Sequence, residues 1–155
     1  MVHVVLVEPE IHWNTGNAGR SCLALGAQLH LVEPLGFSLD EAQVRRAGLD
    51  YWPRVAPKVW SSWDELERKL PDLGDPWFLS AEGKKPLWEI PREDRSIVLV
   101  FGKESTGLEP AIRERYRHKL VCVPMVDPTI RSLNLSTTVG IALYELARPR
   151  VMIAP

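Results

Sequence analysis

Cysteine is scarce in this sequence, charge of the two signs nearly cancels, and long apolar runs are missing. The two cysteines, Cys22 and Cys122, are far apart and do not fit the spacing of a metal site, so they predict buried thiols of a cytoplasmic protein. A formal net charge of −1 provides no overall positive field to attract nucleic acid, although a local patch of basic residues can still bind it. A run of about 18 apolar residues is needed to span a membrane, and the chain has none, so no membrane association is expected.

Several familiar catalytic signatures are also missing. The glycines match neither a P-loop nor a dinucleotide fingerprint, which argues against a nucleoside triphosphatase and a standard NAD enzyme. There is no His-Glu-x-x-His helix and no nucleophile elbow built on serine. The four histidines are scattered without ligand spacing, and of these only His12 lies near a polar loop. We therefore predict no metal site.

Length and composition favour one globular domain over residues 1–155. The chain is 45% hydrophobic and 25% charged, which is close to the average for globular proteins. The N-terminus lacks the basic region and the cleavage site of a signal peptide and is instead predicted to form a strand.

Strand-like and helix-like segments alternate along the chain. Apolar, β-branched runs predict strands at residues 2–7, 29–32, 77–81, 96–101 and 120–123, with a weaker one within 55–60. Helical spacing or helix-start signals predict helices at residues 18–25, 39–48, 62–70, 110–117 and from 135 onward. This alternation indicates an α/β fold with a mostly parallel sheet flanked by helices.

Polar loops follow three of the predicted strands. They comprise residues 14–20, residues 101–108, and the loop through residues 131–134. The ligand crevice of an open α/β sheet lies beyond the carboxyl ends of its strands. In the third loop Ser132, Asn134 and Ser136 are all candidates to cap the last helix, whose free N–H groups suit a polar or anionic ligand. The alternative is an ordinary capped core helix after a turn.

Taken in order, five segments between residue 2 and about residue 148 form a recognisable set. They are Glu8-Pro9-x-Ile11-x-x-Asn14-Thr-Gly-Asn-x-x-Arg20, Glu33-Pro34-x-Gly36-Phe37, Arg45-Arg-Ala-Gly-Leu-Asp-Tyr51, Phe101-Gly-x-Glu104-x-x-Gly107-Leu108, and Val123-Pro-Met125 with Arg131-Ser-Leu-Asn-Leu-Ser136. This set resembles the SPOUT class of RNA methyltransferases, in particular the compact tRNA 2′-O-methyltransferases that act at the wobble nucleotide. The chain departs from the family at Trp13 and Lys103, where proline is common, and around residues 128–130, where the last loop is one residue longer.

The resemblance implies a fold, a reaction and partners. The fold is an α/β sheet whose C-terminal part forms a deep trefoil knot that binds S-adenosyl-L-methionine. The reaction is 2′-O-methylation of a cytidine and/or uridine derivative at tRNA position 34, with S-adenosyl-L-homocysteine as product. The resemblance also implies a homodimer with tRNA, and not DNA, as its substrate. Two alternatives stay open: methylation of another tRNA nucleotide or of rRNA, and a non-catalytic RNA-binding module with the same fold.

The resemblance also assigns roles to residues. Arg20 is expected to activate the 2′-hydroxyl, with Asn14, Ser132 and Asn134 as positioning groups. A guanidinium is a poor base because its pKa exceeds about 12, so Arg20 is better suited to hold a phosphate unless neighbours depress that pKa. The alternative is a plain surface cation. The residues expected to bind the cofactor are Leu79, Gly102, Glu104, Val123, Ser132, Leu133 and Leu135.

Basic clusters are the candidates for RNA contact. The first comprises Arg45, Arg46, Arg54 and Lys58, the second Lys84 and Lys85, and the third Arg113, Arg115, Arg117, His118 and Lys119. Runs of charge are more often solvated faces, so composition alone does not choose among them. Trp13 is expected either to stack on a base or to pack in a dimer interface.

Overall fold

A fully parallel sheet of seven strands forms the centre of the protein. The computed structural model describes residues 1–40, 50–92 and 94–148. The sheet order is β3-β2-β1-β6-β4-β7-β5. The strands are β1 (Val2–Val7), β2 (Gln28–Val32), β3 (Lys58–Trp60), β4 (Asp75–Leu79), β5 (Lys85–Pro86), β6 (Ile97–Phe101) and β7 (Leu120–Cys122). The predicted α/β class with a mostly parallel sheet is confirmed.

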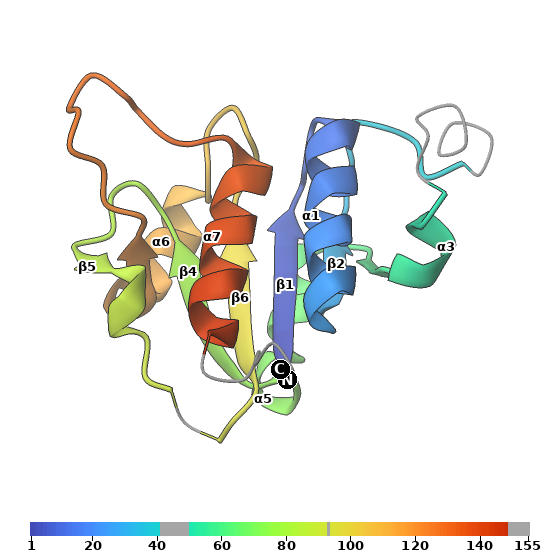
Figure 1. Ribbon diagram of the computed structural model, residues 1–155, viewed down its shortest axis with the longest axis horizontal. Coiled ribbons are helices and arrows are strands. Elements are labelled where there is room, and N and C mark those ends of the chain that lie inside the picture. The colour runs from blue at the N-terminus through green and yellow to red at the C-terminus, as the bar shows by residue number, and fades with distance from the viewer. Residues whose placement is uncertain (41–49, 93, 149–155) are drawn as a thin grey trace, which may run out of the picture.

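Helices cover both faces of this sheet. They are α1 (His12–Leu25), α3 (Trp52–Val55), α4 (Trp63–Glu67), α5 (Leu70–Leu73), α6 (Pro110–Arg115) and α7 (Leu135–Ala147), with 3-10 turns η1 (Leu87–Glu89) and η2 (Arg117–Lys119). Figure 1 shows α1 and α7 side by side on one face. None of the helices within the described ranges is long and apolar enough to cross a membrane.

Two apolar clusters explain why the central strands are hydrophobic along their whole length. Alternate side chains of a strand point to opposite faces, and both faces of a parallel sheet are covered. In β1, Val4 and Leu6 pack in the cluster that includes residues of α1 and α7. Val5 and Val7 pack in the cluster that includes Leu66 of α4. Every buried apolar residue of β1 therefore contributes to one of the two cores.

The first helix begins earlier than the sequence pattern predicts. The sequence pattern predicts a polar loop from residue 14 and a helix from residue 18, but α1 starts at His12. The residue before the helix, Ile11, has no side chain able to cap it. The free backbone N–H groups of Glu10 and Ile11 instead donate to Glu104, a carboxylate far away in the sequence. A tertiary contact thus replaces the local start signal on which the prediction depended.

Smaller differences appear elsewhere along the chain. The helix expected at 62–70 is divided into α4 and α5, and residues 52–55 form α3 just before the short strand β3. Strand β5 was not predicted. The Ser62 hydroxyl accepts from the N–H of Glu65, as in a capping box. The Glu65 carboxylate, however, accepts from the backbone N–H and the hydroxyl of Ser61. Most of the helix expected at 39–48, with Arg45 and Arg46, lies outside the described residues, and the knot stays a prediction.

Candidate active site

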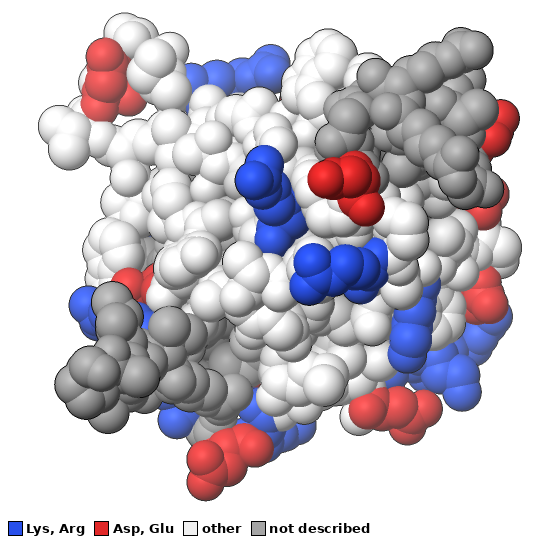
Figure 2. Space-filling model, turned by 45° about the vertical axis from the view of Figure 1, so that its right-hand side comes forward, with Lys and Arg blue, Asp and Glu red and all other residues white. Residues whose placement is uncertain are grey.

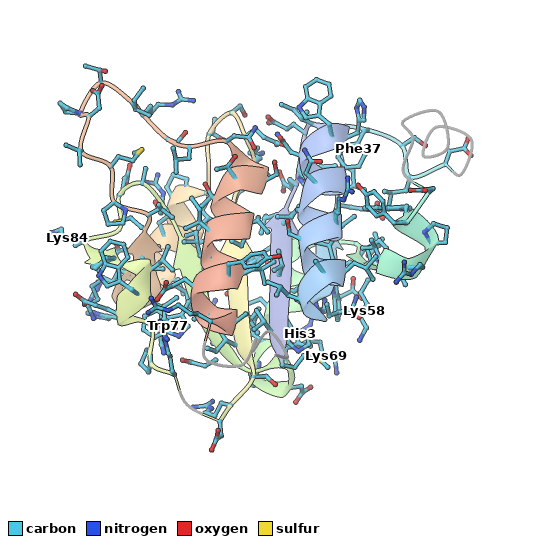
Figure 3. The ribbon with its side chains drawn as sticks, viewed as in Figure 1. His3, Phe37, Lys58, Lys69, Trp77 and Lys84 are labelled. Carbon is cyan, nitrogen blue, oxygen red and sulfur yellow. The ribbon has the colours of Figure 1, made fainter. Side chains whose placement is uncertain are left out.

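The three polar loops meet at the carboxyl end of the sheet. The loop after β6, the first turn of α1 and the segment before α7 come together at this end, where the helices α1 and α7 both begin (Figure 1). Figure 3 places Phe37 beside the first turn of α1, whereas His3 and Lys58 lie toward the opposite end of the molecule. The three segments therefore lie together at the end of the sheet where the sequence predicts a ligand crevice.

Glu104 joins the loop after β6 to the start of α1. One carboxylate oxygen accepts from the backbone N–H of Glu10 at 2.7 Å. The other accepts from the N–H of Ile11 at 3.1 Å and from the Asn14 side-chain amide at 3.2 Å. Negative charge at a helix N-terminus is favourable because the N–H groups there have no partner within the helix. Glu104 therefore acts as the distant cap of α1.

Asn14 and Asn134 continue this network to α7. Asn14 is only 2% exposed, and its side-chain oxygen accepts from the Asn134 amide at 3.0 Å. The Asn134 oxygen accepts from the N–H groups of Ser136 and Thr137 at the start of α7. Among the three cap candidates, Asn134 is the one that caps the helix. The carboxylate and two amides thus lock the starts of both helices in one orientation.

A second set of contacts closes the loop after β6 over the end of β1. Lys103 forms an ion pair with Glu8 at 2.7 Å, and this bond raises the pKa of the Lys103 ammonium. The Ser105 hydroxyl donates to Glu10 at 2.6 Å. Gly102 is required here, because a Cβ at this position would collide with the backbone of Gly107. The lysine found in place of the family's proline therefore ties two strand ends together.

Arg20 lies on an exposed face of α1, two helical turns beyond Trp13. Its guanidinium lies over the ring of Tyr51, 5.5 Å from the centroid, and the Tyr51 hydroxyl donates to the Gly16 carbonyl at 3.0 Å. Within the described ranges Arg20 forms no ion pair with a carboxylate. A guanidinium carries its N–H donors in its own plane, where they suit a bidentate contact with an oxyanion. Tyr51 was not assigned a role from the sequence, although it ends one of the motif segments.

The residues expected to bind the cofactor fall into two groups. Leu79, Gly102 and Val123 lie at or just beyond the ends of β4, β6 and β7, which are adjacent in the sheet. Ser132 and Leu133 are exposed in the segment before α7, and Leu135 opens that helix. Glu104 differs from both groups, because its oxygens are occupied by α1. Gly83 also packs tightly in this region, because a Cβ there would lie 2.6 Å from the backbone of Val121.

The histidines divide as the sequence indicated. His3 and His30 are buried on strands, and their rings are joined by a 3.0 Å hydrogen bond. The Trp60 indole N–H donates to His30 at 3.0 Å, and burial lowers the pKa of His30 to about 4. His12 is exposed and meets Trp13 edge to face beside the candidate site. The two buried histidines are therefore part of the core and are not ligands of this site.

Comparison with known proteins agrees with this geometry. The model of the SpoU rRNA Methylase family matches residues 1–144, and the chain belongs to that family. It is 43% identical over 150 residues to the tRNA (cytidine(34)-2'-O)-methyltransferase of Burkholderia pseudomallei (strain 1106a), covering 96% of this chain and 95% of that one. The sequence resemblance to SPOUT-class RNA methyltransferases is thereby confirmed at the level of the family.

Solved structures show the same fold. One described as "Structural insights into the 2-OH methylation of C/U34 on tRNA" is 42% identical, with a TM-score of 0.86, and the match covers 96% of this chain and 95% of that chain. The SpoU methyltransferase AviRb from Streptomyces viridochromogenes, in complex with the cofactor AdoMet, has a TM-score of 0.78 at 23% identity, covering 96% of this chain and 57% of that chain. At that identity the second likeness concerns the fold alone.

Proposed function

We propose that this protein methylates the ribose 2′-hydroxyl of the wobble nucleotide, position 34, of a tRNA. The observation that carries this function is the complete network from Glu104 through Asn14 to Asn134. It is built from the three motif loops in a chain 43% identical to an enzyme named for this reaction. A non-catalytic RNA-binding module would not need these polar groups together with an Arg20 that forms no ion pair within the described ranges.

The strand-end residues fit S-adenosylmethionine. Leu79 offers an apolar side chain at the end of β4, and Gly102 and Gly83 have no room for a side chain because neighbouring backbone lies against them. Leu133 is 36% exposed on the segment before α7, where an apolar ring would cover it. An adenine needs an apolar slot with backbone polar groups at its edge. When bound, S-adenosylmethionine supplies the methyl group and leaves as S-adenosylhomocysteine.

The chain's own residues would bind and orient the RNA. Arg20, whose guanidinium has no carboxylate partner among the described residues, would hold a phosphate next to the target ribose and so place the 2′-hydroxyl by a bidentate contact. Asn14 and Asn134 keep the starts of α1 and α7 in a fixed relation, so the two halves of the site stay aligned. Good alignment of reacting groups can supply roughly 7–11 kcal/mol of the barrier. Positioning is therefore the main contribution we assign to this site, with Ser132 on its rim.

The working unit in this proposal is a cytoplasmic homodimer with a knotted C-terminal segment. Helix α7 buries Val139, Leu143 and Leu146 but exposes Ile141 and Tyr144, the latter to 55%. A helix that is apolar on more than one side needs a partner for its second face. A two-fold dimer through α7 and α1 would cover the exposed side chains of Ile141 and Tyr144 and bring two copies of the site to one tRNA.

Two measurements test the proposed function. Calorimetry should detect S-adenosylmethionine binding to the purified protein, with S-adenosylhomocysteine as a competitor. Tritium transfer to tRNA, followed by mass spectrometry of nuclease fragments, should place a single 2′-O-methyl group at position 34. Methylation at another tRNA nucleotide or of rRNA only would reject the wobble assignment, and absence of cofactor binding at millimolar concentration would reject a methyltransferase.

A further inference from the structure

The basic residues of α6 and η2 are largely neutralised by carboxylates of the protein itself. Each of the four cations lies within ion-pair distance of an acidic side chain, in the pairs Arg113–Glu82, Arg115–Glu67, Arg117–Glu114 and Lys119–Asp75. His118 accepts from the Arg117 guanidinium. A phosphate backbone approaching this cluster would meet as many anions as cations. The cluster is prominent in the sequence, but it offers little net attraction for RNA.

A different surface carries cations that have no acidic partner. We use the term α1–α3 flank for Arg20 on α1, Arg54 on α3 and Lys58 on the edge strand β3. All three are exposed, and none forms an ion pair within the part of the chain that the structure describes. Figure 2 shows the side of the molecule on which α1 and α3 lie, where Lys and Arg side chains cross the middle with an acidic group beside them, and the other acidic side chains lie toward the margins.

The flank is rigid because α3 packs directly on α1. Gly19 makes this close packing possible, since a Cβ there would lie 2.8 Å from the Trp52 ring and 3.1 Å from Val55. Tyr51 precedes α3, bonds to the carbonyl of Gly16 and lies under the guanidinium of Arg20. The cations of α1 and α3 are therefore held at a fixed spacing. The acidic residue closest to this arrangement in the chain is Asp50, whose charge acts on the Tyr51 hydroxyl.

The remaining exposed lysine pair lies on the opposite side of the molecule. Lys85 belongs to β5 and Lys84 precedes it, whereas Lys58 belongs to β3, and these strands form the two edges of the sheet. Figure 3 shows Lys84 and Lys58 on opposite sides of the α1–α7 pair. Of these cations within the described residues, Arg54 and Lys58 lie on the same side of the molecule as Arg20, the residue to which the proposed function assigns a phosphate.

We propose that the α1–α3 flank binds the phosphate backbone of the tRNA that continues from the modified nucleotide, and that the α6–η2 cluster does not. This inference rests on the proposed function and assigns the surface that the substrate covers. Exposed cations without counter-charges on a rigid surface suit a polyanion, because binding releases condensed counterions without breaking internal ion pairs. A two-fold contact with a second copy of the chain would place these cations opposite one another, and like charges repel. The flank therefore suits tRNA better than a second copy.

Matched double variants test this assignment. Arg54→Gln with Lys58→Gln removes two flank charges outside the catalytic loops. Arg115→Gln with Arg117→Gln removes two paired charges from the other cluster. Filter binding of unmodified tRNA is measured across a salt series, and S-adenosylmethionine affinity is measured by calorimetry to show that each variant is folded. A third variant, Lys84→Gln with Lys85→Gln, tests the opposite edge.

The flank variant should bind tRNA roughly tenfold more weakly at about 0.1 M salt, with the slope of log affinity against log salt smaller by between about 1 and 2. The α6–η2 variant should change affinity less than about twofold with an unchanged slope. Wild-type affinity in the flank variant, or a larger loss in either other variant, overturns the assignment while the methyltransferase function stands. A wild-type protein that binds S-adenosylmethionine but neither binds nor methylates tRNA overturns both.

Discussion

Replacing Glu104 by glutamine tests whether this carboxylate organises the site. Its oxygens accept three hydrogen bonds, two from the backbone of Glu10 and Ile11 and one from Asn14. A glutamine has one oxygen and one NH₂ group. If the glutamine side chain is oriented with its oxygen toward Ile11 and Asn14, those two hydrogen bonds are kept. The NH₂ group then faces the N–H of Glu10, and no hydrogen bond forms because both groups are donors.

The magnitude follows from these contacts. Loss of one hydrogen bond to a charged group costs about 1.5–3 kcal/mol, and loss of the negative charge at the helix start costs about 0.3–1 kcal/mol more. We expect the Glu104→Gln substitution to lower the free energy of unfolding by about 2–4 kcal/mol. Because Asn14 is positioned by Glu104, methyl transfer should fall further than cofactor affinity.

The assay is urea denaturation followed by tryptophan fluorescence at one fixed protein concentration, since an oligomer's stability depends on concentration. Glu109→Gln is the matched control. Glu109 stands at the start of α6, is exposed, and makes no capping hydrogen bond. We expect it to change stability by no more than about 1 kcal/mol, the cost of removing a negative charge from a helix start. Equal stability of the two variants would refute the role of Glu104 as the distant cap.

Three further predictions concern other parts of the molecule. Arg20→Ala and Arg20→Lys should both abolish methyl transfer with cofactor affinity unchanged, because the point charge of a lysine ammonium does not replace the planar guanidinium and its paired N–H donors. Full activity of Arg20→Ala in the tritium assay would exclude Arg20 from the mechanism. The pKa of His30 is about 4 in the folded state and about 6.5 in the unfolded chain. As the pH falls, the unfolded chain therefore gains this proton first. Lowering the pH from 8 to 5 should reduce the free energy of unfolding by about 2 kcal/mol through this residue alone. Denaturation at both values should show a smaller loss in His30→Gln, and an equal loss would contradict this account. Tyr144→Asp should weaken the dimer and tRNA affinity together, as read by sedimentation and filter binding, whereas a monomeric wild type that is fully active at nanomolar concentration would defeat the dimer.

The sequence by itself determined the class of fold and the location of the polar loops. Continuous apolar runs such as Val2–Val7 predict strands covered on both faces, and that requirement is local and strong. The polar loops follow the strands in sequence, so a parallel sheet brings them to one edge. The cap of α7 was also accessible, because Asn134 and the N–H groups that it accepts are neighbours in the chain.

Only the tertiary structure decided where α1 begins and which basic cluster is free. The cap of α1 is Glu104, more than ninety residues away, so no local pattern marks the helix start. The cations of α6 and η2 look like an RNA surface in the sequence, but carboxylates such as Glu67 and Asp75 reach them from other elements. Hydrogen bonds and ion pairs between distant segments depend on how the elements pack, and a pattern of neighbouring residues contains no record of that packing.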